Sequence, residues 1–332
     1  MPIPPPRQKA PQGLCHVGKE VEGAMRTTFA DPDMRASLRD AGYATAPLLD
    51  PAEVADLHRR IAEIRPDLDF PVSGLTHIFY HASFLSPDVA YRRRALDIVR
   101  DALLPKLRMI LPHYRAIAGG LLVKAPHSGE VGMHCDWTST RDLGDVNIAI
   151  WCPLVDVDDD NGALRVIPGS HKLVDNVVAA GIKGYWQGYE EELKARTIPV
   201  PLAAGEAMFF DVSLLHWSRE NRSDALRPVA NLLCVHEDST PVLYVANPAR
   251  DRFELFDMAG DAMIEHSAAE LFRGEVRTPS LGTIPNPNRP VTFAEWERRL
   301  ARRRGEVDPQ GGGIGHWMAR KLGLQPRGAQ TA

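Results

Sequence analysis

Residues 146–171 read VNIAIWCPLVDVDDDNGALRVIPGSH and carry the clearest signals of the fold class. Two apolar runs, 146–154 and 163–167, are separated by an acidic run and by Asn161-Gly162. An Asn-Gly pair between apolar runs is a strong hairpin signal, because both residues tolerate the positive φ of a tight turn. The stretch therefore predicts two short strands joined by a hairpin.

Short apolar segments of the same kind recur from residue 116 onward, with turn signals between them. The expected strands are 118–123, 146–154, 163–167, 207–210 and 229–235. Several short strands separated by turns favour a β-sandwich or barrel. Helical spacing precedes them at 34–42, 51–64 and 90–111. Helices followed by strands are typical of an α+β, mainly β fold in which helices buttress the sheets from outside.

Composition and charge exclude several classes of protein. The formal net charge of −4, from 39 basic and 43 acidic residues, gives no electrostatic support for binding nucleic acid or a membrane surface. The longest apolar runs, such as 147–157, are too short to span a bilayer. The Pro-rich N-terminus lacks the apolar region of a secretory signal. Four cysteines without a CxxC pair fit a reduced, cytoplasmic protein.

A metal site is the sharpest functional hypothesis. His134 and Asp136 are two residues apart, so on a strand they would point to one face while Cys135 points away. His216 follows the expected strand 207–210 and could supply a third ligand. Two histidines and one carboxylate on one face of an octahedral ion leave three positions open, as in non-haem Fe(II) oxygenases.

A second set of residues repeats the same pattern further along the chain. It consists of His236 and Asp238, then His266, with Arg277 eleven residues beyond. Only 27 residues separate Asp238 from His266, too few for the several strands that normally lie between such ligands. His266 also opens a stretch with a helical appearance. The first set is therefore the favoured metal site.

The motifs around the first set resemble those of the phytanoyl-CoA dioxygenase (PhyH) family of Fe(II)/2-oxoglutarate-dependent oxygenases. The matching stretches are 38–43, 49–54, His134-Cys135-Asp136-Trp137-Thr138, Trp151-Cys152-Pro153-Leu154, 161–171, His216-Trp217-Ser218 and Arg227. The resemblance runs from about residue 36 to residue 237. It implies a double-stranded β-helix, the jelly roll of cupin-like proteins, buttressed by helices.

The resemblance also implies a cofactor set. Fe(II) would be held by His134, Asp136 and His216, which are the expected catalytic residues. Related halogenases have a small residue where this carboxylate stands, so Asp136 argues against halogenation. O2 would be the second substrate.

The cosubstrate implied by the resemblance is 2-oxoglutarate, which would chelate the iron. Its distal carboxylate would be held by Arg227, eleven residues after His216, and by the hydroxyl of Ser218. Arginine suits this role because it is planar, always charged and bidentate. Trp151 is expected near the cosubstrate.

The sequence thus predicts a dioxygenase that hydroxylates an unactivated C–H bond of a small molecule and releases succinate and CO2. An amino acid, an acyl compound or a secondary metabolite would be the substrate, and desaturation, epoxidation or ring formation stays open. One alternative is a jelly-roll metalloenzyme without 2-oxoglutarate, such as a cupin-like isomerase or hydrolase. The other is a non-enzymatic binding module.

Three regions are expected along the chain. Residues 1–34 form an N-terminal arm, 35–244 a PhyH-like oxygenase core, and 245–332 a C-terminal extension with helices near 262–272 and 292–304. The extension would supply lid, substrate or oligomer contacts in a monomer or homodimer. Expected substrate-wall residues are Tyr80, His81, Trp186 and Tyr189.

Overall fold

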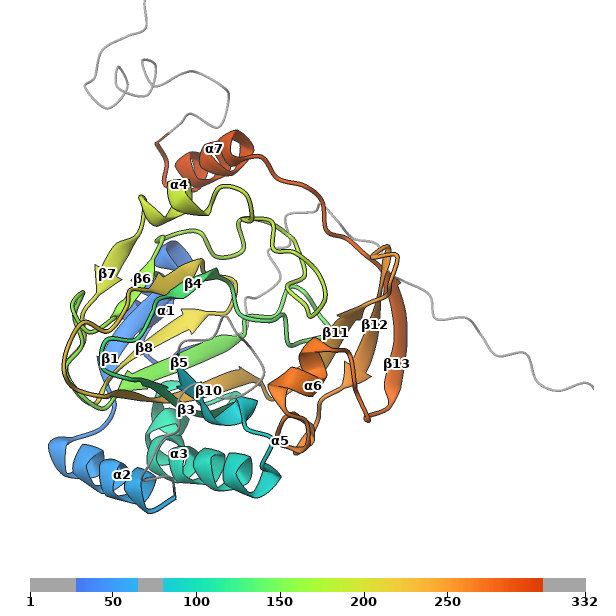
Figure 1. The fold of residues 1–332 in the computed structure, drawn as a ribbon. Coiled ribbons are helices and arrows are strands. Elements are labelled where there is room, and N and C mark those ends of the chain that lie inside the picture. Colours follow the sequence, from blue (N-terminus) through green and yellow to red (C-terminus); the bar gives the residue numbers. More distant parts are fainter. Residues whose placement is uncertain (1–27, 65–79, 307–332) are drawn as a thin grey trace, which may run out of the picture.

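Two antiparallel sheets face each other in the computed structural model, which describes residues 28–64 and 80–306 (Figure 1). The larger sheet has the order β1 (Tyr43–Pro47), β8 (Glu206–Asp211), β5 (Ile148–Pro153), β10 (Arg227–His236), β3 (Tyr114–Lys124), β2 (His81–Ala82). The smaller sheet has the order β4 (Val131–His134), β9 (His216–Ser218), β6 (Leu164–Val166), β7 (Ile198–Val200). This arrangement is the expected jelly roll. Residues 1–27 of the predicted arm lie outside the described residues.

Alternation along β5 shows how the sequence builds two layers of core. All six of its residues are buried. Ala149 and Trp151 pack between the two sheets, whereas Ile148, Ile150 and Cys152 pack against the helices outside the larger sheet. Successive side chains of a strand point to opposite faces, so one central strand serves both layers.

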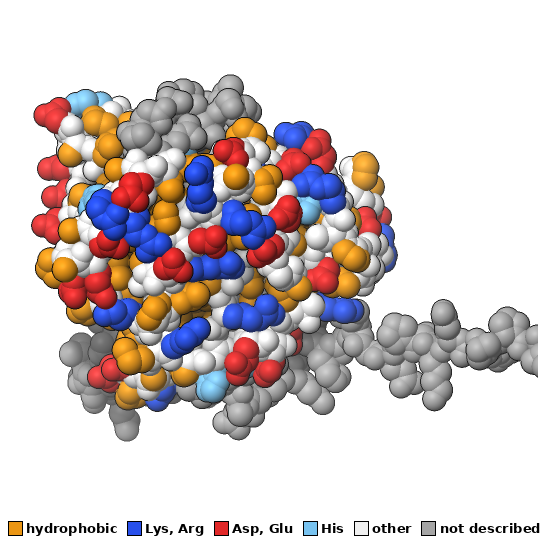
Figure 2. Space-filling model, turned by 90° about the horizontal axis from the view of Figure 1, so that it is seen from below, with side chains coloured by type: hydrophobic (Ala, Val, Ile, Leu, Met, Phe, Trp, Pro, Cys, Tyr) orange, Lys and Arg blue, Asp and Glu red, His pale blue; other side chains and the backbone are white. Residues whose placement is uncertain are grey.

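Helices cover the outer face of the larger sheet, as expected. They are α1 (Pro32–Ala41), α2 (Pro51–Ile64) and α3 (Val89–Ile110). The start of α2 is a reciprocal cap, in which the Asp50 and Glu53 side chains each accept the other's backbone N–H at 2.9 Å. From the side of α2 and α3, Figure 2 shows acidic and basic side chains interleaved. Within the described chain, no helix is long and apolar enough to cross a membrane.

The predicted hairpin at Asn161-Gly162 is wrong. The turn exists, with Gly162 at a φ of 85°, but the strands on either side belong to different sheets. Both edges of β5 are already taken by β8 and β10, so β6 has no free edge there to pair with. Asn161 instead closes the acidic loop, accepting from the Asp158 N–H and donating to the Asp156 carbonyl. The loop is a crossover between the layers.

The C-terminal region contains strands that the sequence did not reveal. A third sheet has the order β11 (Val242–Ala246), β12 (Arg252–Asp257), β13 (Ser280–Pro285), and the predicted boundary at 244 falls inside β11. The single helix expected at 262–272 is two, α5 (Ala262–Glu265) and α6 (Ala268–Phe272), because Ser267 caps a new start. Helix α7 (Phe293–Arg303) confirms the expected last helix; its Trp296 packs with Trp217 and with Leu193 of α4 (Glu190–Lys194).

Candidate metal centre

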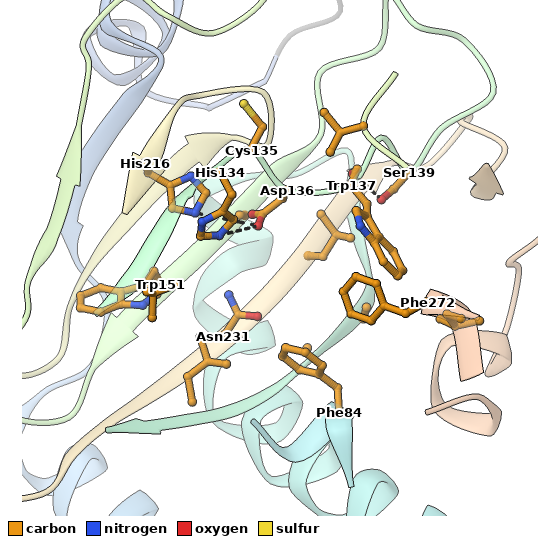
Figure 3. A pocket seen from close by; sticks show the side chains of 18 of the residues that line it. Phe84, His134, Cys135, Asp136, Trp137, Ser139, Trp151, His216, Asn231 and Phe272 are labelled. Atoms are coloured by element: carbon orange, nitrogen blue, oxygen red, sulfur yellow. Dashed lines mark hydrogen bonds and ion pairs between the residues drawn. The ribbon is translucent and has the colours of Figure 1, made fainter. Parts of the chain in front are cut away.

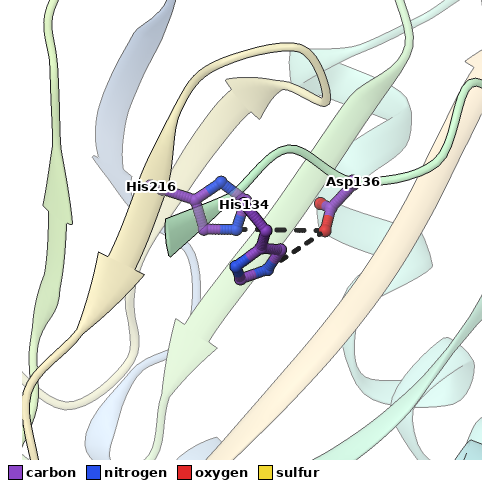
Figure 4. Close-up of side chains that lie close together, drawn as sticks. All are labelled: His134, Asp136 and His216. Atoms are coloured by element: carbon purple, nitrogen blue, oxygen red, sulfur yellow. Dashed lines mark ion pairs between the residues drawn. The ribbon is translucent and has the colours of Figure 1, made fainter. Parts of the chain in front are cut away.

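Three side chains, those of His134, Asp136 and His216, point toward one another (Figure 4). His134 of β4 and His216 of β9 are paired across the antiparallel ladder. Asp136 Oδ1 lies 3.7 Å from Nε2 of His134 and 3.9 Å from Nε2 of His216. One ligand atom of each residue lies within 4.8 Å of the other two. The structure thus brings together the three residues that the sequence selected.

Asp136 reaches this position by a route that differs from the prediction. Strand β4 ends at His134, so Asp136 lies beyond the strand, where its N–H donates to the Val212 carbonyl. The pairing of β4 with β9 also shifts register between Val131 and His134, which inserts an extra residue into β4. Such bulges redirect side chains near active sites. Together, the bulge and the departure of the chain from the sheet orient the three side chains toward one point.

Both histidines are oriented by the same kind of contact. Nδ1 of His134 lies 2.7 Å from the Gly132 carbonyl, and Nδ1 of His216 lies 2.9 Å from the Leu214 carbonyl. A carbonyl only accepts, so each Nδ1 carries the proton and each Nε2 offers its lone pair to the centre. Burial, helped by the nearby His134, lowers the pKa of His216 to about 4. A neutral ring of this kind fits a divalent metal ion.

The second His-x-Asp set does not assemble. Nδ1 of His266 donates to the Ala262 carbonyl at 2.8 Å, and its Nε2 accepts the Arg277 N–H at 2.9 Å. The side chain of Asp238 is 72% exposed. Among the residues that the structure describes, His134, Asp136 and His216 are the one group of three potential ligands close enough to share an ion.

Arg227 has the environment expected of an anion site. It begins β10 and is 4% exposed, and its Nε and Nη1 have no hydrogen-bond partner within the described chain. Its guanidinium lies 5.2 Å from the centre of the Trp151 ring. Burial lowers the pKa of Arg227 to about 10, so it remains charged at neutral pH. A buried, unpaired guanidinium is costly, and a bound carboxylate would satisfy it.

The remaining predicted site residues line a cavity beside the triad. Ser218 is buried two residues after His216 on β9, and it lines the cavity with Trp151. Of the expected wall residues, Tyr80 and Trp186 line the cavity. His81 and Tyr189 are outside its lining, and His81 lies 2.8 Å from the Tyr91 hydroxyl.

The sequence reasoning missed Asn231. It lies on β10 four residues after Arg227, and side chains separated by an even number of residues share a face of a strand. That spacing is the signal that could have found it. Its Nδ2 donates to the Ile150 carbonyl at 3.2 Å, and its side chain lies on the cavity floor between the triad and the apolar end (Figure 3).

The cavity beside the triad has a volume of about 770 Å³. Its polar end is formed by the triad, Arg227 and Ser218, and its other end by apolar side chains that include Phe84, Trp137 and Phe272 (Figure 3). The donor set and the unpaired guanidinium fit Fe(II) and 2-oxoglutarate. The volume leaves room for a further small molecule.

Comparison with known proteins gives relatives and a shared fold. Phytanoyl-CoA dioxygenase domain-containing protein 1 of Danio rerio is 30% identical over 126 residues, which are 34% of this chain and 41% of that protein. Dioxygenase sphC of Aspergillus fumigatus is 29% identical over 86 residues, 26% of this chain and 20% of that protein. The matched parts thus span less than half of each relative's length.

A solved structure, the non-heme alpha ketoglutarate dependent carbocyclase SnoK from nogalamycin biosynthesis, shares the fold. Its TM-score is 0.51 at 18% identity, over 64% of this chain and 86% of that one. The family model of phytanoyl-CoA dioxygenase (PhyH) matches residues 38–229. Because these residues make up more than half of the chain, the protein belongs to the phytanoyl-CoA dioxygenase family.

Proposed function

We propose that this protein is an Fe(II)- and 2-oxoglutarate-dependent dioxygenase. It would hydroxylate an unactivated C–H bond of a small molecule with O2, while 2-oxoglutarate is oxidised to succinate and CO2. The observation that carries the proposal is the pairing of two sites in one cavity: a His-Asp-His triad and a buried Arg227 without a hydrogen-bond partner in the described chain. Membership of the family supports the same chemistry.

Each residue has a distinct role in this proposal. His134, Asp136 and His216 would hold the metal ion, which supplies the capacity to activate O2. Arg227 and Ser218 would bind the distal carboxylate of 2-oxoglutarate, and Trp151 would form the wall beside it. The walls of the cavity would hold the target carbon near the metal and exclude water. Asp136 occupies a coordination position, so chloride would have no place there and hydroxylation is favoured over halogenation.

A jelly-roll metalloenzyme that does not use 2-oxoglutarate is the second candidate. It would need the triad but would have no use for a buried guanidinium that lacks a hydrogen-bond partner among the described residues. The deciding experiment is succinate formation by the purified protein with Fe(II), ascorbate and 2-oxoglutarate, alongside Asp136→Ala. Succinate from the wild type alone supports the proposal. Metal binding without succinate, in the presence of a broad metabolite extract, would favour the second candidate.

A non-enzymatic binding module is the third candidate. Calorimetric titration with Mn(II), a redox-stable substitute for Fe(II), separates it from both enzymes. The proposal expects one site in the wild type and none in His134→Ala. Equal titrations of the two proteins would show that the triad holds no ion.

A further inference from the structure

The end of the cavity away from the triad is apolar and largely aromatic. Its side chains come from four separate parts of the fold, and Figure 3 shows several of them facing the same space. They include Phe84, Trp137, Met263, Leu271 and Phe272. The rings of Trp137 and Phe272 meet edge to face, with centroids 4.8 Å apart and planes at 72°. Phe272 is nevertheless 45% exposed, so the apolar end of the cavity has room for another apolar group.

Few charged side chains line the cavity apart from the metal triad and Arg227. Within the described lining, the charged side chains besides the metal triad and Arg227 are Arg92, Glu130 and Lys183. Buried Arg92 donates to the carbonyls of Ile264 at 2.8 Å and Ser86 at 2.6 Å. Glu130 and Lys183 are exposed, and Glu130 is paired with Lys194 at 2.8 Å. Among the described lining residues, the buried charged side chain other than the triad and Arg227 is thus hydrogen-bonded, and the two remaining ones are exposed to solvent.

This distribution discriminates between the substrate classes that the sequence left open. A free amino acid carries two charges, and burying a charge without a partner is strongly unfavourable. Flat aromatic walls suit a ring system, since aromatic contacts add to the energy of burying apolar area. Asn231 on the cavity floor supplies an uncharged polar group that could bind a hydroxyl or carbonyl of such a molecule.

The segment that contains α5 and α6 contributes Met263, Leu271 and Phe272 to the apolar end, and this segment lies outside the family match at 38–229. Helix α3 holds this segment in place. Arg92 binds the Ile264 carbonyl, and Arg93 pairs with Asp261 and with Glu265, each at 2.7 Å. The α5–α6 segment thus contacts the core of the protein through α3, although it lies outside the part of the sequence that the family model matches.

We propose that the substrate is an uncharged molecule with an apolar ring system, and that the α5–α6 segment determines this specificity. The inference rests on the proposed function, because it places the ring beside the proposed metal site. Met263 and Phe272 are the specificity-determining side chains, and Asn231 orients the bound molecule by a hydrogen bond.

A matched pair of fluorescent probes tests the proposal in the metal-free protein. N-phenyl-1-naphthylamine is neutral, and 1-anilinonaphthalene-8-sulfonate is the same skeleton with one added sulfonate. In the Arg227→Ala variant, which removes the unpaired guanidinium of the polar end, the neutral probe should bind at one site, at least about 10-fold more tightly than the sulfonate, because the apolar end of the cavity offers that charge no partner. Equal or tighter binding of the sulfonate would overturn the proposal.

Substitutions test whether the probes bind at the apolar end of the cavity. Met263→Lys should weaken the neutral probe at least about 10-fold and strengthen the sulfonate, whereas Met109→Lys, at a position 70% exposed on α3, should change neither. Phe272→Ala removes one aromatic contact and should weaken the neutral probe about 3- to 10-fold. Ile198→Ala is its control, since Ile198 and Phe272 are both 45% exposed. Unchanged probe affinity in both Met263→Lys and Phe272→Ala would overturn the assignment.

A turnover measurement connects the apolar end of the cavity to the reaction. Succinate formation is followed with a neutral ring ketone such as progesterone, with free leucine, and with octanoyl-CoA. Stimulation by the ring ketone, reduced in Phe272→Ala, supports the proposal, and stimulation by leucine or octanoyl-CoA alone overturns it. If neither these compounds nor a broad metabolite extract yields succinate and the probe preference persists, the proposed function fails and the assignment of the apolar end stands. If succinate forms and the probe preference is reversed, only the specificity inference fails.

Discussion

The chain carries the same ligand pattern twice, and only one copy forms a site. His134, Asp136, His216 and Arg227 converge around one cavity. The second copy, His236, Asp238, His266 and Arg277, has equal spacing from its last histidine to its arginine. There, however, both ring nitrogens of His266 are used by the backbone and the carboxylate of Asp238 is in solvent.

The difference lies in where strands place the side chains. His134 and His216 are partners across an antiparallel ladder, which makes neighbours of residues 82 positions apart in sequence. His266 stands between two short helices instead, and no ladder pairs it with His236. A sequence motif therefore identifies candidate ligands, and strand pairing decides which of them meet. Three pairs of variants and one metal-addition experiment test this comparison.

Removing the carboxylate should have the largest effect. Asp136→Ala should weaken Mn(II) binding by more than about 100-fold, since even outer partners of metal ligands contribute 10- to 100-fold. It should also abolish succinate formation. Calorimetry and a succinate assay measure the two effects. Asp238→Ala is the matched control and should behave as wild type in both; a loss of metal in that variant would contradict the comparison.

Removing the arginine should act on the cosubstrate rather than on the metal. Arg227→Ala should raise the KM for 2-oxoglutarate about 10- to 100-fold, because one or two charge-assisted hydrogen bonds are lost. Mn(II) affinity measured without 2-oxoglutarate should stay near the wild-type value. Arg277→Ala, whose guanidinium binds Glu270 on the surface, should leave this KM unchanged. If both arginine variants gave the same KM, Arg227 would have no role in binding 2-oxoglutarate.

Metal addition should stabilise only proteins with an intact triad. At a Mn(II) concentration 100 times the Kd, the free energy of unfolding should rise by about 2.7 kcal/mol, because the ion binds only the folded state. Thermal unfolding should show this gain for wild type and for Asp238→Ala, and not for Asp136→Ala. Stabilisation of Asp136→Ala by the same amount would place the ion elsewhere.

The smallest expected effect separates a structural histidine from a ligand. His266→Ala removes a buried ring with two backbone contacts, so the free energy of unfolding should fall by about 1–3 kcal/mol while Mn(II) binding remains. Urea denaturation and calorimetry measure the two quantities. His113→Ala, whose side chain is 51% exposed, should alter neither. Loss of Mn(II) binding in a folded His266→Ala would give the second set a role in the metal site.

The jelly roll and the triad could be predicted because they rest on local signals. The runs that became β5, β8 and β10 are apolar and bounded by turns, and the ligands lie where short strands end. The pairing of these strands has no such signal. Asn161-Gly162 specifies a turn equally well in a hairpin and in a crossover, and only the occupied edges of β5 decide between them.

The C-terminal strands and the apolar wall were beyond prediction for a different reason. Strand β13 has no buried residue in its six positions, so it shows no alternation of apolar and polar side chains. Phe272 and Trp137 are 135 positions apart in sequence and meet only because α6 returns to the cavity. Contacts of that range depend on the completed tertiary structure.

The pairing of β4 with β9 has a consequence beyond ligand placement. Strand β4 is four residues long, forms the edge of its sheet and is irregular in register, so the ladder alone gives it few hydrogen bonds. An ion shared by His134, Asp136 and His216 would link the edge strand β4 to its neighbour β9. Metal occupancy would therefore stabilise this edge of the sheet against local opening, in addition to supplying the reactive centre.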